Sequence, residues 1–272
     1  MTTNRSISHN MTDNTRQDYQ IWSKVPKITL FFWIIKILTT TVGETAADFL
    51  NGNLNLGLTN TTFVMSSLLL ITLFFQFRSR KYVPRIYWLA VVLISIVGTL
   101  ISDNLVDNLG VTLETTTIVF TVALLLTFAA WYVSEKTLSI HSIYTVRREA
   151  FYWLAILFTF ALGTAAGDLT AEGLHLGYWE AALMFAALIG VITIAYYFFK
   201  MNAVLAFWSA YILTRPLGAS LGDYLSQPRH EGGLGLGTIG TSAIFLITIL
   251  SLVLYLTKTR RDEIPLRSST KE

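Results

Sequence analysis

Eight long apolar runs constrain this chain more than any other feature. They cover residues 28–49, 58–77, 86–104, 111–134, 150–171, 178–199, 202–224 and 237–257. A helix needs about 20 apolar residues to cross roughly 30 Å of hydrocarbon, and each run is close to this length. Only 14% of the residues are charged, against about 25% in soluble proteins, which excludes a soluble enzyme. The sequence therefore predicts an all-α integral membrane protein with eight transmembrane helices.

Basic residues predict the orientation of the spans, because Lys and Arg are enriched in cytoplasmic loops. All but three of the 20 Lys and Arg residues lie before the first span, after the eighth, or in loops that follow even-numbered spans. We therefore expect both termini in the cytoplasm, with tails at 1–27 and 258–272 around a membrane domain at 28–257. The first 27 residues lack the apolar stretch of a signal peptide, so we expect this tail to be retained.

Aromatic residues near the span ends are typical of the belts that anchor helices at the membrane interface. Trp88, Trp131 and Tyr152 are examples, as are Tyr178 and Trp179. We interpret them as interfacial anchors.

One motif recurs near the outer end of each odd-numbered span: a glycine, four residues later a small residue, and then an aspartate. The copies are Gly43, Ala47, Asp48; Gly98, Ser102, Asp103; Gly163, Gly167, Asp168; and Gly218, Gly222, Asp223. The aspartates are 55, 65 and 55 residues apart, which indicates four two-helix repeats in two halves, at about 28–140 and 148–257. Small residues at this spacing let helix backbones approach closely. We expect the odd helices to pack centrally through Gly43, Gly98, Gly163, Gly167, Gly218 and Gly222, and the even helices to face lipid.

Three segments carry a resemblance to a known family. They are KVPKITLFFWIIKILTTTVGETAADFL at 24–50, GTAAGDLTAE at 163–172 and ILTRPLGASLGDYLSQP at 212–228. From about residue 24 to 258 the chain resembles bacterial uncharacterised membrane-anchored proteins, which are built from a repeat of unknown function. The resemblance implies a helical membrane fold in the bacterial cytoplasmic (inner) membrane, and it implies no particular activity.

Acidic residues gather at the end of the spans opposite the basic loops. Besides Asp48, Asp103, Asp168 and Asp223, this end carries Glu44, Asp107 and Glu172, each four residues from a motif aspartate. Like charges at this spacing destabilise a helix, and a carboxylate near a helix C-terminus is unfavourable. Clustered carboxylates relieve their repulsion by binding a cation or by sharing protons. We predict that these seven residues bind a cation, with the four aspartates as metal ligands.

The ligand chemistry favours a hard divalent cation such as Mg²⁺, Ca²⁺ or Mn²⁺, because only carboxylate oxygens are gathered here. The chain has no cysteine, which excludes thiolate sites and disulfides, and we expect no cofactor besides that cation. The alternative is that the acids are solvated residues at helix ends. We favour this alternative for Glu114, Glu180 and Glu231.

Lys36 and Arg215 are the basic residues inside spans, and charges there are costly enough to suggest a function. Arg215 lies eight residues before Asp223, about 12 Å along a helix. It is either a counter-ion that competes with the bound cation or part of a static salt bridge. Lys36 either extends toward the interface or takes part in proton coupling. Pro216 predicts a kink in the seventh span.

Three functions remain open. The first is a secondary transporter that exchanges a divalent cation for protons at the aspartate cluster, with the bilayer, the cation and protons as partners. No phosphate-binding loop or nucleic-acid motif is present, so neither ATP hydrolysis nor nucleic-acid binding is expected. The second is an intramembrane aspartyl hydrolase, but Ala165-Ala166-Gly167-Asp168 and Ser220-Leu221-Gly222-Asp223 lack the Gly-x-Gly-Asp pattern of such proteases. The third is a scaffold or channel without transport. We expect no enzyme activity, and the oligomeric state stays open.

Overall fold

Eight long helices make up the part of this protein that the structure describes. The computed structural model describes residues 23–53 and 56–263, which contain no strand. In order, the helices are α1 (Leu30–Asp48), α2 (Leu58–Arg78), α3 (Pro84–Asp103), α4 (Leu113–Glu135), α5 (Val146–Asp168), α6 (Tyr178–Phe198), α7 (Ala203–Ser226) and α8 (Gly237–Thr259). Each begins and ends within four residues of a predicted span. The all-α fold is confirmed, while the predicted tails lie mostly outside the described residues.

Seven of the eight helices are long and apolar enough to cross a membrane. The exception is α7, which has 24 residues but carries Arg215 and Asp223 together with several small polar residues. Length and composition therefore support a membrane protein with at least seven spans.

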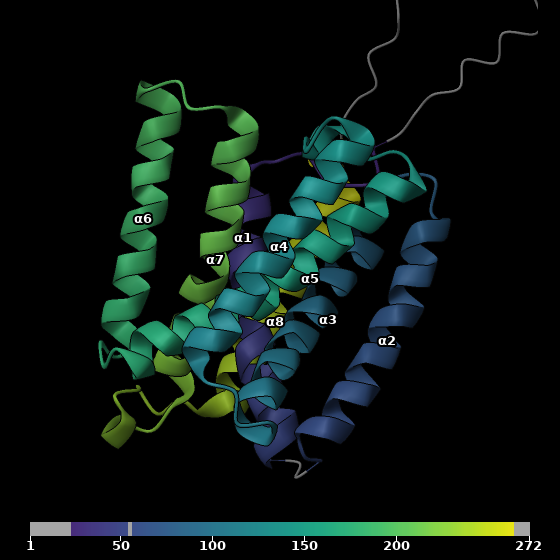
Figure 1. The fold of residues 1–272 in the computed structure, drawn as a ribbon. Helices are drawn as coiled ribbons and strands as arrows, with labels where there is room; N and C mark the ends of the chain where they lie inside the picture. The colour runs from purple at the N-terminus through teal and green to yellow at the C-terminus, as the bar shows by residue number, and fades with distance from the viewer. Residues whose placement is uncertain (1–22, 54–55, 264–272) are drawn as a thin grey trace, which may run out of the picture.

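The odd helices form a closed inner ring. α1 contacts α3 and α7, and α5 contacts the same two helices. Each even helix packs outside the ring against the next odd helix, and α8 packs against α1 (Figure 1). Between 61 and 67% of the best apolar window is buried in α1, α3 and α5, against 17 to 28% in the even helices. The even helices therefore expose apolar surface on the outside of the bundle.

The motif glycines set the register of the inner ring. A Cβ added to Gly43, Gly98, Gly163 or Gly218 would lie 2.6, 2.6, 2.5 and 2.5 Å from the Cβ of Ser95, Phe160, Arg215 and Thr40, respectively. Real Cβ atoms essentially never approach below 3.0 Å. Every contacted residue lies three positions before the motif glycine of the next repeat. The same close contact therefore joins all four repeats. The contact between α7 and α1 is equivalent to the contact between α1 and α3, which closes the ring.

The second small position of the motif is less crowded. A Cβ at Gly167 would lie 3.5 Å from the Ala219 Cβ, which is an ordinary contact, and one at Gly222 would lie 3.2 Å from the Glu44 Cβ. The first two repeats already carry Ala47 and Ser102 here. Only the first glycine of each motif is therefore essential for the close approach.

Three of the inner helices end in a wider turn that the sequence did not predict. π-Helical turns follow the motif aspartate at Phe49–Asn53, Asn104–Asn108 and Leu169–Gly173. In the fourth repeat, α7 instead continues as an α-helix to Ser226, and Gln227 N–H donates to Asp223 O. The fourth aspartate therefore lies inside regular helix, whereas the other three lie at a junction.

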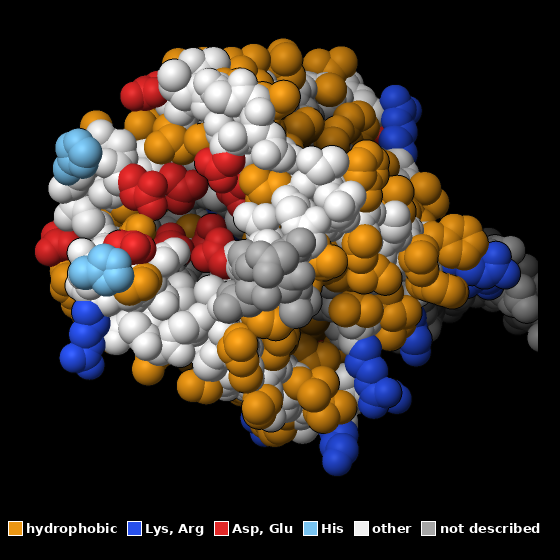
Figure 2. Space-filling view, turned by 90° about the horizontal axis from the view of Figure 1, so that it is seen from below, with side chains coloured by type: hydrophobic (Ala, Val, Ile, Leu, Met, Phe, Trp, Pro, Cys, Tyr) orange, Lys and Arg blue, Asp and Glu red, His pale blue; other side chains and the backbone are white. Residues whose placement is uncertain are grey.

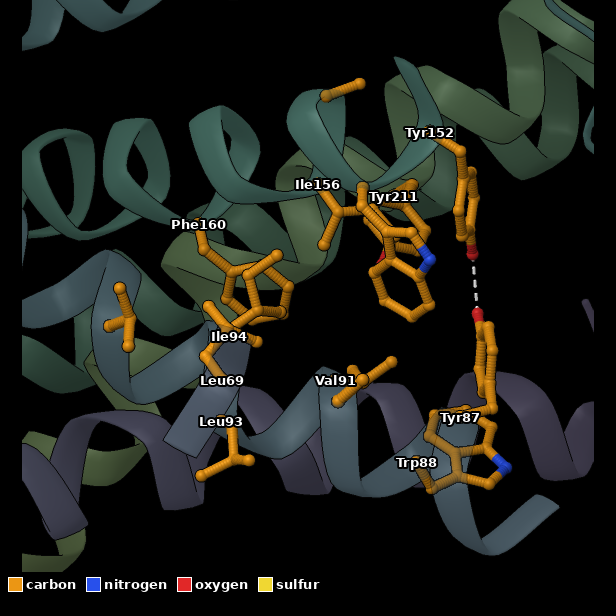
Figure 3. Close-up of a cluster of buried hydrophobic side chains, with 14 of the residues drawn as sticks. Leu69, Tyr87, Trp88, Val91, Leu93, Ile94, Tyr152, Ile156, Phe160 and Tyr211 are labelled. Carbon is orange, nitrogen blue, oxygen red and sulfur yellow. Dashed lines mark hydrogen bonds between the residues drawn. The ribbon is translucent and has the colours of Figure 1, made fainter. Parts of the chain in front are cut away.

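The interpretation of Trp88, Trp131 and Tyr152 as interfacial anchors is wrong. These side chains are at most 2% exposed and belong to the central core. The hydroxyls of Tyr87 and Tyr152 meet at 2.5 Å between α3 and α5, as Figure 3 shows. Because they are buried inside the bundle, these residues pack the core instead of the membrane surface. Trp179, by contrast, is 44% exposed.

Buried polar contacts join the chain at the end where α1 begins, which we call the basic end. Lys24 Nζ donates to Glu149 Oε2 at 2.6 Å and to Phe77 O at 3.0 Å, and Gln76 donates to Glu149 Oε1. Tyr82 Oη donates to Asp262 Oδ2 at 2.5 Å. Residues before α1 are thus tied to α2 and α5 and close this end of the ring.

Candidate functional site

The opposite end, which we call the acidic end, is hollowed. Seen along the bundle, Asp and Glu side chains surround a depression between the helix ends (Figure 2). We call it the acidic hollow. The predicted carboxylates at this end are Glu44, Asp48, Asp103, Asp107, Asp168, Glu172 and Asp223. They come from the C-terminal ends of α1, α3, α5 and α7 and from the π-helical turns after α3 and α5, since the repeats place their motifs at one level.

Three of these carboxylates form a compact group, which we call the acidic trio. Oxygens of Glu44, Asp168 and Asp223 all lie within 4.8 Å of one another. They come from α1, α5 and α7, and Glu44 and Asp223 are only 5 and 7% exposed. A single cation can reach all three oxygens at this spacing. Carboxylates from different helices also hold a ligand more rigidly than neighbours on one helix would.

The other four predicted ligands lie around the acidic trio. Asp48 and Asp103 are half-buried, whereas Asp107 and Glu172 are exposed. Glu172 Oε1 accepts a hydrogen bond from Tyr178 Oη at 2.9 Å. The structure therefore separates the predicted set into an inner trio and acids that line the approach to it. Glu114 and Glu180 lie in the first turns of α4 and α6, where a carboxylate complements the helix dipole.

Arg215 lies directly behind the acidic trio and is fully buried. Its Nη2 donates to Glu44 Oε2 at 3.0 Å, to Thr164 Oγ1 at 2.7 Å and to the Thr99 hydroxyl, and its Nη1 donates to Thr40 O at 2.9 Å. These partners come from α1, α3 and α5. The Arg215 guanidinium therefore contacts all three other helices of the inner ring. Its ion pair with Glu44 of α1 is the predicted pairing with an acid from a neighbouring odd helix. α7 continues through Pro216 without interruption, and the predicted kink stays a prediction.

The repeats explain why Arg215 lies on the axis of the ring. The equivalent positions in the first three repeats are Thr40, Ser95 and Phe160. These are the residues against which the motif glycines of neighbouring helices pack. Short or flat side chains at three positions leave room at the centre, and the arginine of the fourth repeat fills it.

The match to a known family agrees with this fourfold arrangement. A family model described as Repeat of Unknown Function (DUF347) matches residues 31–82, 86–137, 151–202 and 206–262. The chain belongs to this family. Each DUF347 repeat contains one inner helix and the outer helix that follows it, so the predicted internal repeats are confirmed. No curated protein and no solved structure matches the chain.

The DUF347 repeats share a tryptophan that our sequence analysis did not single out. Trp33, Trp88, Trp153 and Trp208 each lie fifteen residues before a motif aspartate. Trp88, Trp153 and Trp208 are buried in the half of the bundle toward the basic end. The constant spacing is the signal that identifies this repeated tryptophan.

A cavity of about 710 Å³ lies beside the DUF347 ring, toward the basic end, and contains none of the predicted ligands. It is lined by α1, α6, α7 and the segment Leu138–His141. Ile37, Ala210 and Thr214 form its wall toward the inner ring. The cavity therefore approaches the axis from the side opposite the acidic hollow.

Proposed function

We propose that this protein is a secondary transporter that moves a divalent cation across the membrane in exchange for protons, and that the cation binds at the acidic trio. The observation that carries the proposal is the approach of carboxylate oxygens of Glu44, Asp168 and Asp223 to within 4.8 Å of one another at the acidic end of the bundle. Three carboxylates from three helices suit a hard cation such as Mg²⁺, Ca²⁺ or Mn²⁺.

The charge balance of the acidic trio supports binding of a cation. Two unit charges 4.8 Å apart repel by about 3–4 kcal/mol at an effective dielectric constant of about 20. Within the residues that the structure describes, Arg215 forms an ion pair with Glu44 alone, so Asp168 and Asp223 retain their mutual repulsion. A divalent cation relieves this repulsion, and so do protons. Each therefore displaces the other, which is the basis of an exchange.

Arg215 acts in this proposal as a resident cation. A metal bound to Glu44 competes with the guanidinium for this carboxylate. On metal binding Arg215 loses its ion pair with Glu44 but keeps hydrogen bonds to Thr40 and Thr164. Metal binding is thereby linked to the position of α7.

The proposed orientation places the acidic end outside the cell and the basic end in the cytoplasm of a bacterial inner membrane. α7 then serves as the eighth span, shielded from lipid by α6 and the ring, and its polar residues face the axis. Both termini are cytoplasmic. The hollow opens to the outside, while Arg215 and the buried core between it and the basic end close the axis toward the cytoplasm.

Transport requires a second arrangement in which the axis opens at the basic end. α7 is the helix we expect to move, because Pro216 supplies no backbone N–H and leaves a carbonyl of the preceding turn without its helical donor. Pro216 directly follows Arg215, which hydrogen-bonds to the other three helices of the inner ring.

The direct test uses the full-length protein reconstituted in liposomes, with Mn²⁺ as the probe. Binding is measured calorimetrically and flux with an internal metal-sensitive dye. We expect Asp168→Asn and Asp223→Asn each to weaken Mn²⁺ binding by about tenfold or more, as loss of a ligand does, and to abolish flux. Glu180→Gln is the matched control, since Glu180 is exposed and lies in the first turn of α6, outside the predicted ligand set.

Wild-type protein that neither binds nor carries Mn²⁺, Mg²⁺ or Ca²⁺ would refute the proposal. So would aspartate variants that match Glu180→Gln in binding. Conductance that is independent of a pH gradient would instead assign the protein as a channel.

A second candidate is an intramembrane aspartyl hydrolase, which is favoured by the closeness of Asp168 and Asp223. Paired aspartates can act as general acid and base. Cleavage of a model transmembrane peptide that Asp168→Asn abolishes would establish this activity in place of transport.

A further inference from the structure

Lys36 is a buried amine without an acceptor. Its side chain is fully buried, and its Nζ has no hydrogen-bond partner among the described residues. It lies 4.1 Å from the centre of the Phe160 ring and 4.3 Å from that of Tyr211. Ring faces attract an ammonium, but they accept no full hydrogen bond, and a buried ammonium without an acceptor is costly. The ring contacts favour the ammonium and the missing acceptor disfavours it, so the two effects oppose each other.

The other repeats show that the fold does not need an amine at this position. The residues equivalent to Lys36 are Val91, Ile156 and Tyr211, all fully buried in the core. Ile156, Tyr211 and Val91 lie together with Phe160 in one cluster (Figure 3). Three apolar or aromatic side chains fill this layer, so the lysine of the first repeat serves something other than packing.

The groups that face Lys36 make its charge sensitive to Arg215. From α7, Arg215 Cζ lies 5.4 Å from the same Phe160 ring, and the Tyr211 hydroxyl has no hydrogen-bond partner in the described part of the chain. α3 and α5 contribute the titratable side chains Tyr87 and Tyr152, whose hydroxyls hydrogen-bond to each other.

The remaining neighbours of α1 bring no counter-ion to Lys36. Tyr255 of α8 packs on Phe31, five residues away along α1. Glu44 lies eight residues away on α1 and is bound to Arg215. Arg215 is therefore the charge that acts on Lys36, and their interaction is repulsive.

A cavity toward the basic end is lined by sequence neighbours of Lys36, though not by Lys36 itself. Ile37 follows it on α1, and Ala210 and Thr214 flank Tyr211 on α7; all three line the cavity of about 710 Å³. Ser139 and His141 line the same cavity nearer the basic end. The α1–α7 seam thus separates Lys36 from a space that extends away from the acidic hollow.

We propose that Lys36 carries the proton that is exchanged for the cation. The inference rests on the proposed function. When a divalent cation takes Glu44 from Arg215, the guanidinium turns its uncompensated charge toward Phe160 and Lys36. The ammonium then releases one H⁺ to the side from which the cation entered and remains as the neutral amine. When the cation leaves on the opposite side, Arg215 returns to Glu44 and Lys36 takes up a proton from that side, through the cavity where that side is the basic end. The acidic trio selects the cation, and Lys36 couples its movement to the pH gradient.

The test separates exchange from coupling in liposomes that contain the full-length protein. Exchange of Mn²⁺ for labelled Mn²⁺ at equal pH needs the acidic trio alone, whereas accumulation of Mn²⁺ driven by a pH gradient needs the proton site. We expect Lys36→Met to lose accumulation and to keep exchange at the wild-type rate. Lys36→Arg is expected to behave alike, because a guanidinium does not release its proton.

Ile156→Met is the matched control, since it places the same side chain at the equivalent position of the third repeat. It should keep both activities. Gradient-driven accumulation of Mn²⁺ by Lys36→Met would overturn the inference. Loss of both activities in Lys36→Met and Lys36→Arg, while Ile156→Met stays active, would also overturn it, because Lys36 would then have a structural role. If wild-type protein exchanges no Mn²⁺, the proposed cation transport itself fails.

Discussion

The glycine contacts of the inner ring give the sharpest test of the packing. In Gly98→Ala, the new Cβ would lie 2.6 Å from the Phe160 Cβ, 3.1 Å from the Ala161 N and 3.2 Å from the Phe160 carbonyl carbon. Carbon atoms pack best at about 3.5–4.0 Å, so α3 and α5 must separate by about 1 Å. Two of the three contacts are to backbone atoms, which a change of rotamer cannot move.

The magnitude follows from two opposing effects. Overpacking of a tight core costs about 1–3 kcal/mol, whereas replacing glycine by alanine within a helix stabilises it by about 0.5–1 kcal/mol. We expect Gly98→Ala to lower the free energy of unfolding by about 1–2 kcal/mol on balance. At about 2–4 °C per kcal/mol, the melting temperature should fall by several degrees.

The assay is the thermal melting of detergent-purified variants, followed by fluorescence-detected size exclusion. Gly190→Ala and Gly240→Ala are matched controls, because an added Cβ at either position meets nothing within 4 Å. Both should melt at or slightly above the wild-type temperature. If Gly98→Ala melts with these two controls, α3 and α5 do not approach as described, and the register of the whole ring is wrong.

Further predictions concern the basic end. Lys24→Met should lower the free energy of unfolding by about 3–5 kcal/mol, because it leaves the fully buried Glu149 without its counter-ion. Chemical denaturation measures this loss, and the double variant Lys24→Met/Glu149→Met should recover most of it. A double variant as unstable as Lys24→Met would contradict the ion pair. Burial raises the pKa of the Asp262 carboxyl above its ordinary value of 3.8, so the folded state binds more protons than the unfolded state, and stability should fall as the pH rises from about 4 through the folded pKa. Melting curves of wild type and Asp262→Asn over this range check the sign, since the variant should lack the fall.

The positions of the helices and the repeats were predictable because they depend on local sequence. Apolar length and periodic glycines recur within single spans, and each helix end lies close to a predicted one. The partners of Arg215 were not predictable in the same way. Glu44, Thr99 and Thr164 occupy one equivalent position in three repeats, but this position meets the arginine only because the glycine contacts set the register between helices.

Other parts of the structure carry signals that are ambiguous in sequence. Tyr152 and Trp131 lie near helix ends, where an interfacial and a buried aromatic residue have the same spacing. The choice depends on whether the helix belongs to the ring and on what covers its end. Lys24 falls in a predicted tail, yet it is 5% exposed because Glu149 binds it from α5. The π-helical turns have no sequence signal that we recognise.

The closed ring shows how four repeats fused in one chain differ from a symmetric tetramer of four identical chains. A tetramer of one hairpin would have the same glycine contacts around its axis, because cyclic symmetry repeats every interface. It would also repeat every residue, so a single arginine on the axis would become four guanidinium groups at one point. Fusion into one chain removes that restriction. Gene duplication thus permits what symmetric assembly forbids: one Arg215 and one Lys36 at the centre of a fourfold frame.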